Sequence, residues 1–393
     1  MNRLIQQEAY RTTGMPHTAD PPPRSQMYCD PDNRFTILAH ETPSLEALLR
    51  MDTYSAAIAY VRGDFSVTGD VCAAVEFFVN NTRSVVRKGW FTLLAHLGRV
   101  SISSLTANRR AVARDIGFHY DLSNDFYQLF LDPWMQYEAG TFTAPECTLE
   151  QAQLKKLANI CDKIELLPKH RMLDIGCGWG GLLAFAGERR GIQGCGCTLS
   201  MQQQQFAQCM LERKGLAGRI EVRRTDYRDV VGTYDRVTSI GMFEHVGRRH
   251  LLKYFEKIRS LLSPDGLFLN RGIVRPASMS DGPETLFLQR RVFPGGDLPH
   301  LADVVRAAEI AGLEVESLED YRIDYALTCK AWVARLRENV AKCVLLVGDR
   351  AYRTWLLFLG ASAVNFEAGL VDAVEIVFRP RSRRTVLLSH LKV

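Results

Sequence analysis

A glycine-rich segment, residues 173–181 with the sequence LDIGCGWGG, constrains the fold of this chain more than any other feature. An apolar run leads into Asp174 and a helical pattern follows Gly181, so the segment predicts a strand, a tight turn and a helix. Glycines in such a turn let the backbone approach a bound ligand closely because they carry no Cβ. The segment therefore predicts an α/β fold that holds a nucleotide-like cofactor at a strand end.

A second motif, residues 241–247 with the sequence GMFEHVG, follows a later apolar run. It places a carboxylate, Glu244, and an imidazole, His245, at the end of another predicted strand. Open parallel sheets carry out their chemistry at the carboxyl ends of their strands. We therefore expect the cofactor and these acid-base groups to face one cleft.

Size and composition set further limits. With 393 residues and 47% hydrophobic content the chain can bury one large core and a second, smaller one. A net charge of +5 is mild and predicts no nucleic-acid partner, while weak attraction to an anionic membrane surface stays open. No apolar run is long enough to span a bilayer, so any contact with lipid is expected to be peripheral.

The ten cysteines show no paired C-x-x-C spacing, and no secretory leader precedes them. We expect reduced thiols in the core of a cytoplasmic protein. Cys195 and Cys197 point the same way on a predicted strand, but no second pair of ligands lies nearby in sequence. A zinc site is therefore not expected, and no metal is predicted.

The chain divides into three parts on its patterning. Residues 1–34 are polar and broken by prolines, which predicts a disordered tail. Residues 35–107 show short helical patterns, at 44–49, 72–78 and 90–95, and predict a small helical domain. Within it, two Gly-Asp pairs in residues 60–70 flank an alternating segment and suggest a hairpin-like excursion. Residues 108–393 form the α/β part.

Five short apolar or alternating runs in that part are each followed by a helical pattern, which predicts parallel strands with right-handed crossovers. The predicted strands are residues 171–175, 193–198, 220–224, 234–240 and 266–273. Helical patterns around residues 329–346 and 352–371 precede a last strand at 374–378. The basic end, residues 379–384, is expected to be solvated.

The spacing of the glycines distinguishes between nucleotides. A dinucleotide fold prefers G-x-G-x-x-G and a phosphate loop ends in Gly-Lys-Ser/Thr, and neither spacing is present. The D-x-G-x-G-x-G arrangement from Asp174 through Gly176 and Gly178 suits S-adenosyl-L-methionine instead. That cofactor has no phosphate but carries an ammonium that an acidic residue can bind.

Polar residues at two other strand ends support the same cofactor. Thr198 and Ser200 follow the second strand and can bond the ribose and methionine portions. Asp226 can accept the exocyclic amine of adenine, with Tyr227 as an apolar wall. Most of the glutamine run at 202–205 is expected to be a polar helix face.

These motifs, together with residues 119–125 (HYDLSND), 131–137 (LDPWMQY), 292–299 (VFPGGDLP) and 324–325, resemble the cyclopropane-fatty-acyl-phospholipid synthases and their mycolic-acid-modifying relatives. The resemblance runs from about residue 45 to residue 380. It implies a Rossmann-like class I methyltransferase fold, with a mostly parallel seven-stranded sheet, behind a small lipid-associated N-terminal domain. The implied cofactor-binding residues are Tyr120, Tyr137, Asp174, Gly176, Gly178, Thr198, Ser200, Gln203, Asp226, Tyr227 and Ile240.

The resemblance implies transfer of a methyl group to a cis double bond in an acyl chain of a phospholipid, followed by proton loss and closure of a three-membered ring. The site must be dry, because water would quench the intermediate cation. In this family the base is understood to be a bicarbonate held by a cysteine, a glutamate, a histidine, a tyrosine and backbone groups. A cytoplasmic enzyme, peripheral at the inner membrane surface and forming a homodimer, is implied as well.

Only part of that anion site carries over. The glutamate falls on Glu244, the tyrosine on Tyr325 and the backbone positions on Gly241 and Ile273. Three side chains depart from the pattern. The family cysteine is replaced by Ala139, the histidine by Arg271 and the serine that touches the cofactor by Glu138.

The departures leave several interpretations of the anion site. Arginine could hold a carbonate bidentately. Alternatively, the carboxylate of Glu138 takes over the role of the anion, and Arg271 compensates the charges of Glu138 and Glu244. In a third interpretation Arg271 turns outward and Glu138 lines a solvated rim.

The same departures also leave more than one function possible. Methyl transfer without ring closure, to an alkene carbon or to an amine, is one alternative, and in an amine methyltransferase His245 would be catalytic rather than structural. An impaired family member that binds lipid or cofactor is another. Tyr120 and Trp179 either contact the cofactor or belong to the core, and Phe287, Phe293, Trp332 and Trp355 either line an acyl tunnel or are ordinary core.

Overall fold

The computed structural model describes residues 26–40, 45–49, 51, 53–81, 123–277 and 298–381. Tyr120, Phe287 and Phe293, the helical pattern at 90–95 and most of the 292–299 motif lie outside the described residues. So do residues 1–25 and the proposed domain boundary at residues 107 and 108.

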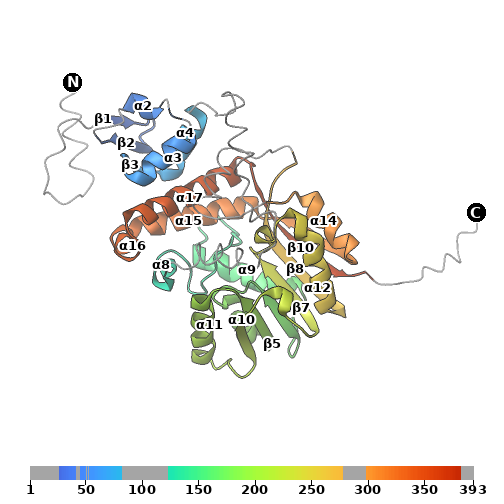
Figure 1. Cartoon of the computed structure of the whole chain (residues 1–393). Coiled ribbons are helices and arrows are strands. Elements are labelled where there is room, and N and C mark those ends of the chain that lie inside the picture. Colours follow the sequence, from blue (N-terminus) through green and yellow to red (C-terminus); the bar gives the residue numbers. More distant parts are fainter. Residues whose placement is uncertain are drawn as a thin grey trace, which may run out of the picture.

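A seven-stranded sheet forms the larger part of the molecule (Figure 1). Its strand order is β6-β5-β4-β7-β8-β10-β9, with the first five strands parallel and β10 antiparallel to both of its neighbours. The strands are β4 (Arg171–Ile175), β5 (Gln193–Thr198), β6 (Ile220–Arg224), β7 (Tyr234–Ile240), β8 (Leu262–Val274), β9 (Leu313–Asp320) and β10 (Asp372–Pro380). The predicted mostly parallel α/β sheet is confirmed, since all six predicted strands are present.

Helices cover the sheet and begin where the sequence provides caps. Thr148 and Gln151 form a capping box at α9 (Leu149–Lys163), and Ser200 caps α11 (Met201–Arg213). The remaining helices of more than one turn in this part are α8 (Asn124–Gln128), α10 (Gly181–Arg190), α12 (Leu251–Leu261), α14 (Leu301–Ile310), α15 (Arg322–Glu338), α16 (Val340–Val347) and α17 (Asp349–Glu367). Short 3₁₀ turns lie at Tyr227–Asp229, Phe243–His245 and Arg248–His250.

The N-terminal unit differs from its prediction. It holds an antiparallel sheet of β1 (Gln26–Cys29), β2 (Phe35–Ala39) and β3 (Phe65–Gly69), beside α2 (Leu45–Leu49), α3 (Thr53–Arg62) and α4 (Val71–Asn81). The predicted small helical domain therefore contains a three-stranded sheet as well as helices, and a disordered tail is wrong for residues 26–34. In β2, buried side chains alternate with half-buried ones, although the sequence FTILA contains only one polar residue. The supposed hairpin at 60–70 is the end of α3 followed by β3, which pairs with β2.

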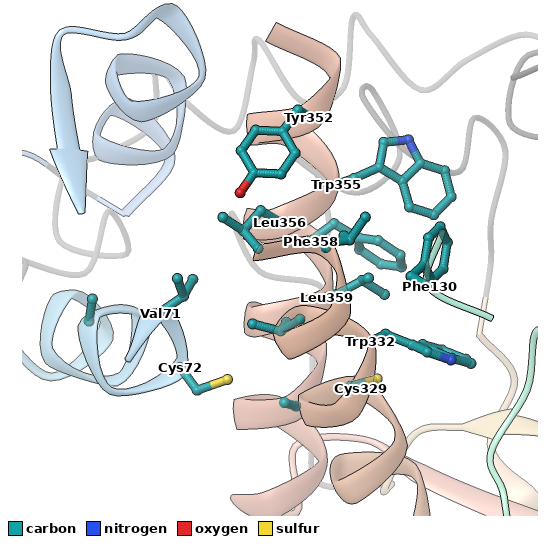
Figure 2. Packing of buried hydrophobic residues seen from close by; sticks show 14 of the residues in the cluster. Val71, Cys72, Phe130, Cys329, Trp332, Tyr352, Trp355, Leu356, Phe358 and Leu359 are labelled. Carbon is teal, nitrogen blue, oxygen red and sulfur yellow. The ribbon is translucent and has the colours of Figure 1, made fainter. Parts of the chain in front are cut away.

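One hydrophobic core joins this unit to the helices of the larger part. Figure 2 shows Val71 and Cys72 of α4 on one side of α17, with Phe130 and Trp355 on the other. A Cβ at Gly360 of α17 would lie 3.2 Å from Cγ1 of Val71, so the two helices are closely packed. No helix among the described residues is both long and apolar enough to cross a membrane.

Candidate active site

The glycine loop between β4 and α10 has the backbone that its sequence predicts. Gly176, Gly178 and Gly180 have φ values of +72°, +53° and +80°, which residues with a Cβ rarely adopt. A Cβ at Gly181 would lie 2.0 Å from the carbonyl oxygen of Trp134. At Gly178, by contrast, a Cβ would meet nothing within 4 Å, so the turn leaves room beside its backbone.

Asp174 ends β4 inside this loop and is buried. Its Oδ1 accepts a hydrogen bond of 2.7 Å from the hydroxyl of Thr238 on β7. Burial raises the pKa of the Asp174 carboxyl to about 7. A buried carboxyl with no bonded cation among the described residues fits a ligand that brings an ammonium, as S-adenosylmethionine does.

The predicted polar residues after β5 form one buried cluster. The hydroxyl of Thr198 donates to Oε1 of Gln203 at 2.6 Å, and the backbone N–H of Gln203 donates to Oγ of Ser200 at 3.3 Å. Because this cluster also caps α11, the same residues fix the helix start and present hydroxyl and amide groups at the strand end.

The adenine-binding prediction meets a different arrangement at the end of β6. Both carboxylate oxygens of Asp226 are engaged by Arg228, with Nε 2.8 Å from Oδ1. Tyr227 is partly buried and lies edge-on to Tyr254 at 5.6 Å. Tyr227 can therefore form an apolar wall of an adenine site. An adenine amine that bonds Asp226 would have to share the carboxylate with Arg228.

Aromatic residues pack between the glycine loop and α15. The Trp179 indole N–H donates to Oδ1 of Asn124 at 2.7 Å, and its ring lies 4.8 Å from that of Tyr127. Tyr137 stacks on Trp332 at 5.2 Å. Trp179, Trp332 and also Trp355 belong to the hydrophobic core, in agreement with the core interpretation of these three residues.

Glu244 is buried in the 3₁₀ turn after β7, as the second motif predicts. Its Oε1 accepts a 2.6 Å hydrogen bond from the backbone N–H of Ile273, while Oε2 has no hydrogen-bond partner among the described residues. Burial, reinforced by the nearby Glu138, raises the pKa of Glu244 to about 7. A Cβ at Gly272 would lie 2.6 Å from Oε1, so this carboxylate needs the glycine beside it.

His245 and Tyr325, two other predicted site residues, lie on different elements. His245 is in the same turn as Glu244, and desolvation lowers its pKa to about 4, so the imidazole is neutral near pH 7. Tyr325 on α15 is partly buried and stacks on Phe366 at 4.4 Å. Ile240 ends β7 and pairs with Arg271 in the sheet register.

Arg271 and Glu138 are both buried and face each other. Nε of Arg271 lies 2.9 Å from Oε2 of Glu138, and Nη2 donates to the carbonyl oxygen of Ala139 at 2.9 Å. The interpretation in which Arg271 turns outward and Glu138 lines a solvated rim is therefore wrong. The expected compensation of Glu138 by Arg271 is confirmed, but the second carboxylate beside the arginine is Glu375, whose Oε2 lies 3.4 Å from Nη1, rather than Glu244.

Glu375 extends the pair into a network that the sequence did not indicate. Lys163 bonds Glu375 and lies 2.7 Å from both Glu319 and the hydroxyl of Tyr321. The guanidinium of Arg271 lies 4.0 Å from the centre of the Tyr321 ring. The only sequence signal was one acidic residue inside an otherwise apolar final strand.

Lys156 on α9 is a second residue that the sequence interpretation missed. Its side chain is fully buried, and Nζ has no hydrogen-bond partner among the described residues. Burial lowers its pKa to about 8, against the opposing influence of Glu138 and Asp132. The same helix supports Glu138 directly, since the side-chain amide of Gln153 donates to the Glu138 carbonyl at 2.7 Å.

The strand order, the glycine loop after β4 and the buried carboxylate at its tip define a class I S-adenosylmethionine-dependent methyltransferase. No metal-binding group of three or more suitable side chains occurs among the residues described.

The chain belongs to the mycolic acid cyclopropane synthetase family, whose model matches residues 107–376. A probable fatty acid methyltransferase from Pseudomonas putida is 33% identical over 361 residues, which cover 90% of this chain and 89% of that protein. The cyclopropane-fatty-acyl-phospholipid synthase of Escherichia coli K12 is 34% identical over 260 residues, 66% of each chain.

Solved structures agree with this assignment. The mycolic acid cyclopropane synthase CmaA1, complexed with SAH and CTAB, matches with a TM-score of 0.65 and 29% identity, covering 68% of this chain and 97% of that one. The cyclopropane synthase MmaA2 from Mycobacterium tuberculosis matches with the same TM-score of 0.65 at 27% identity, with the same coverage of each chain. This chain is thus an S-adenosylmethionine-dependent enzyme of the cyclopropane synthase type.

Proposed function

We propose that this enzyme transfers a methyl or methylene group from S-adenosylmethionine to the cis double bond of an unsaturated acyl chain in a phospholipid. The observation that carries the proposal is a pair of buried carboxylates, Glu138 and Glu244, in a region where Met242 of the second motif packs against Gly176 of the glycine loop. Methyl transfer to an alkene produces a cation that must lose a proton without meeting water. A base in a dry site, next to the cofactor loop, suits that requirement.

Named residues have distinct roles in this proposal. Asp174, Thr198, Ser200 and Gln203 hold the cofactor, while Gly241, Glu244 and Tyr325 surround the reacting centre. A Cβ at Gly241 would lie 3.7 Å from Cγ of Glu138, which supports a shared location for Glu138 and the second motif.

The identity of the acceptor is supported by the names of relatives. They include fatty acid and phospholipid enzymes, and also a sphingolipid C9-methyltransferase from Candida albicans that is 32% identical over 334 residues. An acyl lipid is common to these names. The phospholipid headgroup is the more specific part of the proposal.

A lipid acceptor requires access to a membrane, so we propose that the enzyme is cytoplasmic and binds peripherally to the inner membrane surface, as a homodimer. Leu345, Leu346 and Val340 on the short helix α16 are exposed, at 86%, 42% and 43%. Together with the exposed Lys342, they form a surface that suits partial burial in an anionic lipid interface.

Methyl transfer to an alkene without ring closure is the second candidate, favoured by the replacement of two anion ligands at Ala139 and Arg271. In transfer to an amine, His245 would be a weak base near neutral pH because its pKa is about 4.

Expression in bacteria that lack their own synthase tests the proposal. A gain of one CH₂ with loss of the double bond in the membrane fatty acids is the expected result. A gain with the double bond kept, or a branched product, would support the second candidate. Unchanged fatty acids, with a folded enzyme that binds SAH, would count against an acyl acceptor and favour an amine substrate or a binding role. The Asp174→Asn variant serves as the inactive control.

A further inference from the structure

The site already contains an anion that belongs to the chain. We propose that Glu138 is the base that removes the proton after methyl transfer, and that this enzyme therefore works without a bound bicarbonate. The inference rests on the proposed function, since it assigns the base for that same reaction.

First, each nitrogen of the Arg271 guanidinium already lies near an acceptor of the protein, and both Nη groups form hydrogen bonds. Nε lies 2.9 Å from Glu138, Nη1 lies 3.4 Å from Glu375, and Nη2 donates to the backbone carbonyls of Ala139 and Gly140 at 2.9 and 3.4 Å. A carbonate would have to compete with these acceptors.

The second step is that Glu138 remains able to react. Its carboxylate is buried, and neither oxygen makes a hydrogen bond among the described residues, because the contact of Oε2 with Arg271 is an ion pair without hydrogen-bond alignment. The side chain also lies against Gly241, the first residue of the second motif. A basic oxygen is therefore available at the end of β7.

The third step is the local charge. Glu138 and Glu244 are both buried, and Glu138 is near enough to help raise the pKa of Glu244; Arg271 and, on α9, Lys156 are cations that interact with Glu138. Glu375 lies on the other side of Arg271 and is also paired with Lys163. A third anion in front of these carboxylates would be repelled in a site with little water to screen it.

The chemical step balances with these groups. When bound, S-adenosylmethionine supplies an electrophilic methyl group, and its sulfur keeps the electrons of the broken C–S bond. The π electrons of the acyl chain form the new C–C bond, which leaves a cation on the neighbouring acyl carbon. Glu138 accepts one proton from the added methyl, and the freed C–H electrons close the ring on the cation. The neutral Glu138 carboxyl returns its proton to water after the product leaves.

Chemical rescue tests the inference on vesicles of dioleoyl phosphatidylglycerol. In bicarbonate-free buffer we expect full turnover by the wild type, and a loss of about 100-fold or more in Glu138→Gln, which keeps the volume but removes the base. Glu138→Ala leaves a carboxylate-sized space beside Arg271, so added formate should restore part of its turnover. Glu375→Ala is the matched control: it also removes a carboxylate partner of Arg271, but formate should not rescue it.

A binding measurement keeps the test independent of turnover. With SAH bound, ¹³C NMR of labelled formate and bicarbonate should detect binding to Glu138→Ala and none to the wild type. Wild-type turnover that depends on bicarbonate, bicarbonate binding to the wild type, or an unchanged rate in a folded Glu138→Gln variant would each overturn the inference. Absence of product from every lipid would instead refute the proposed acceptor, and the NMR result would still decide whether Glu138 occupies the anion position.

Discussion

Arg271 on β8 and Glu375 on β10 are direct partners in the antiparallel register, and Nη1 of the arginine lies 3.4 Å from Oε2 of the glutamate. Both side chains are buried, at 1% and 3% exposure. A buried guanidinium is tolerated only with partners that replace its hydration. The pairing of two strands thus supplies a fixed counter-charge for the arginine that also faces Glu138.

Removal of that partner should destabilise the fold. Glu375→Gln leaves Arg271 with a single buried carboxylate, and breaking a buried pair typically lowers the free energy of unfolding by about 3–5 kcal/mol. Urea denaturation measures the change. Glu316→Gln, which breaks the half-exposed pair with Arg379, is the control and should change stability by less than about 1 kcal/mol. Equal effects of the two substitutions would show that the buried network contributes no more to the free energy of unfolding than the half-exposed pair does.

Stability should depend on pH through Glu244. Its pKa is raised from 4.5 to about 7 in the folded state, so the folded protein holds a proton that the unfolded chain releases between these values. The contribution is complete below about pH 4.5 and is lost as pH rises through 7, with a magnitude on the order of 3 kcal/mol. Compared with Glu244→Gln, the wild type should lose unfolding free energy between pH 5 and pH 8. Parallel pH curves for the two proteins would contradict the assignment.

Binding of SAH should depend on pH through Asp174. In the free protein its pKa is about 7, and the ammonium of the ligand favours the ionised form. Affinity measured by calorimetry should therefore rise as pH increases from 5 to 7, by up to about tenfold per pH unit, and level off above 7. Asp174→Asn should bind weakly with no such rise. A pH-independent affinity in the wild type would mean that the ammonium does not meet this carboxyl.

Two glycine-to-alanine substitutions, one in the glycine loop and one outside it, test the role of the loop. Gly181→Ala places a Cβ 2.0 Å from a backbone carbonyl, so the loop or Trp134 must move, at about 1–3 kcal/mol and with loss of SAH binding. Gly218→Ala meets nothing within 4 Å and should stay within about 0.5 kcal/mol of the wild type. Thermal melting with and without SAH distinguishes the two. Unimpaired SAH binding in Gly181→Ala would separate this loop from the cofactor.

The parts of the fold that the sequence predicted are those with a local signature. Strands β4 to β7 have the predicted bounds because each is a short apolar or alternating run between a turn and a helix. Asp174, Glu244 and the Thr198 cluster were located because motif residues fall at strand ends. Their burial and bonding follow from that position.

Features that depend on contacts between distant parts of the chain had no such local sequence pattern. Strand β9 was missed because it is an exposed edge strand in which the alternation of apolar and acidic residues ends at Ser317, and acidic residues follow on both faces. The partnership of Arg271 with Glu375 joins residues far apart in the chain, and Lys156 looks like an ordinary surface lysine until α9 packs against the sheet. The N-terminal sheet was missed because β1 lies in the polar stretch that was interpreted as a tail, and β2, with the sequence FTILA, shows no regular alternation of polar and apolar residues.

The core shared by α4 and α17 means that the catalytic part of this chain is not a self-contained module. Without the N-terminal unit, the side of α17 around Gly360 would be bare to water, and the carbonyl of Phe65 would no longer be there to receive the hydrogen bond that Arg353 now donates to it. The described N-terminal unit, within residues 26–81, thus covers one side of α17, whose Trp355 packs against Tyr127 and Tyr137. A shortened protein that contains only residues 107–376 would therefore expose this apolar side of α17 to solvent.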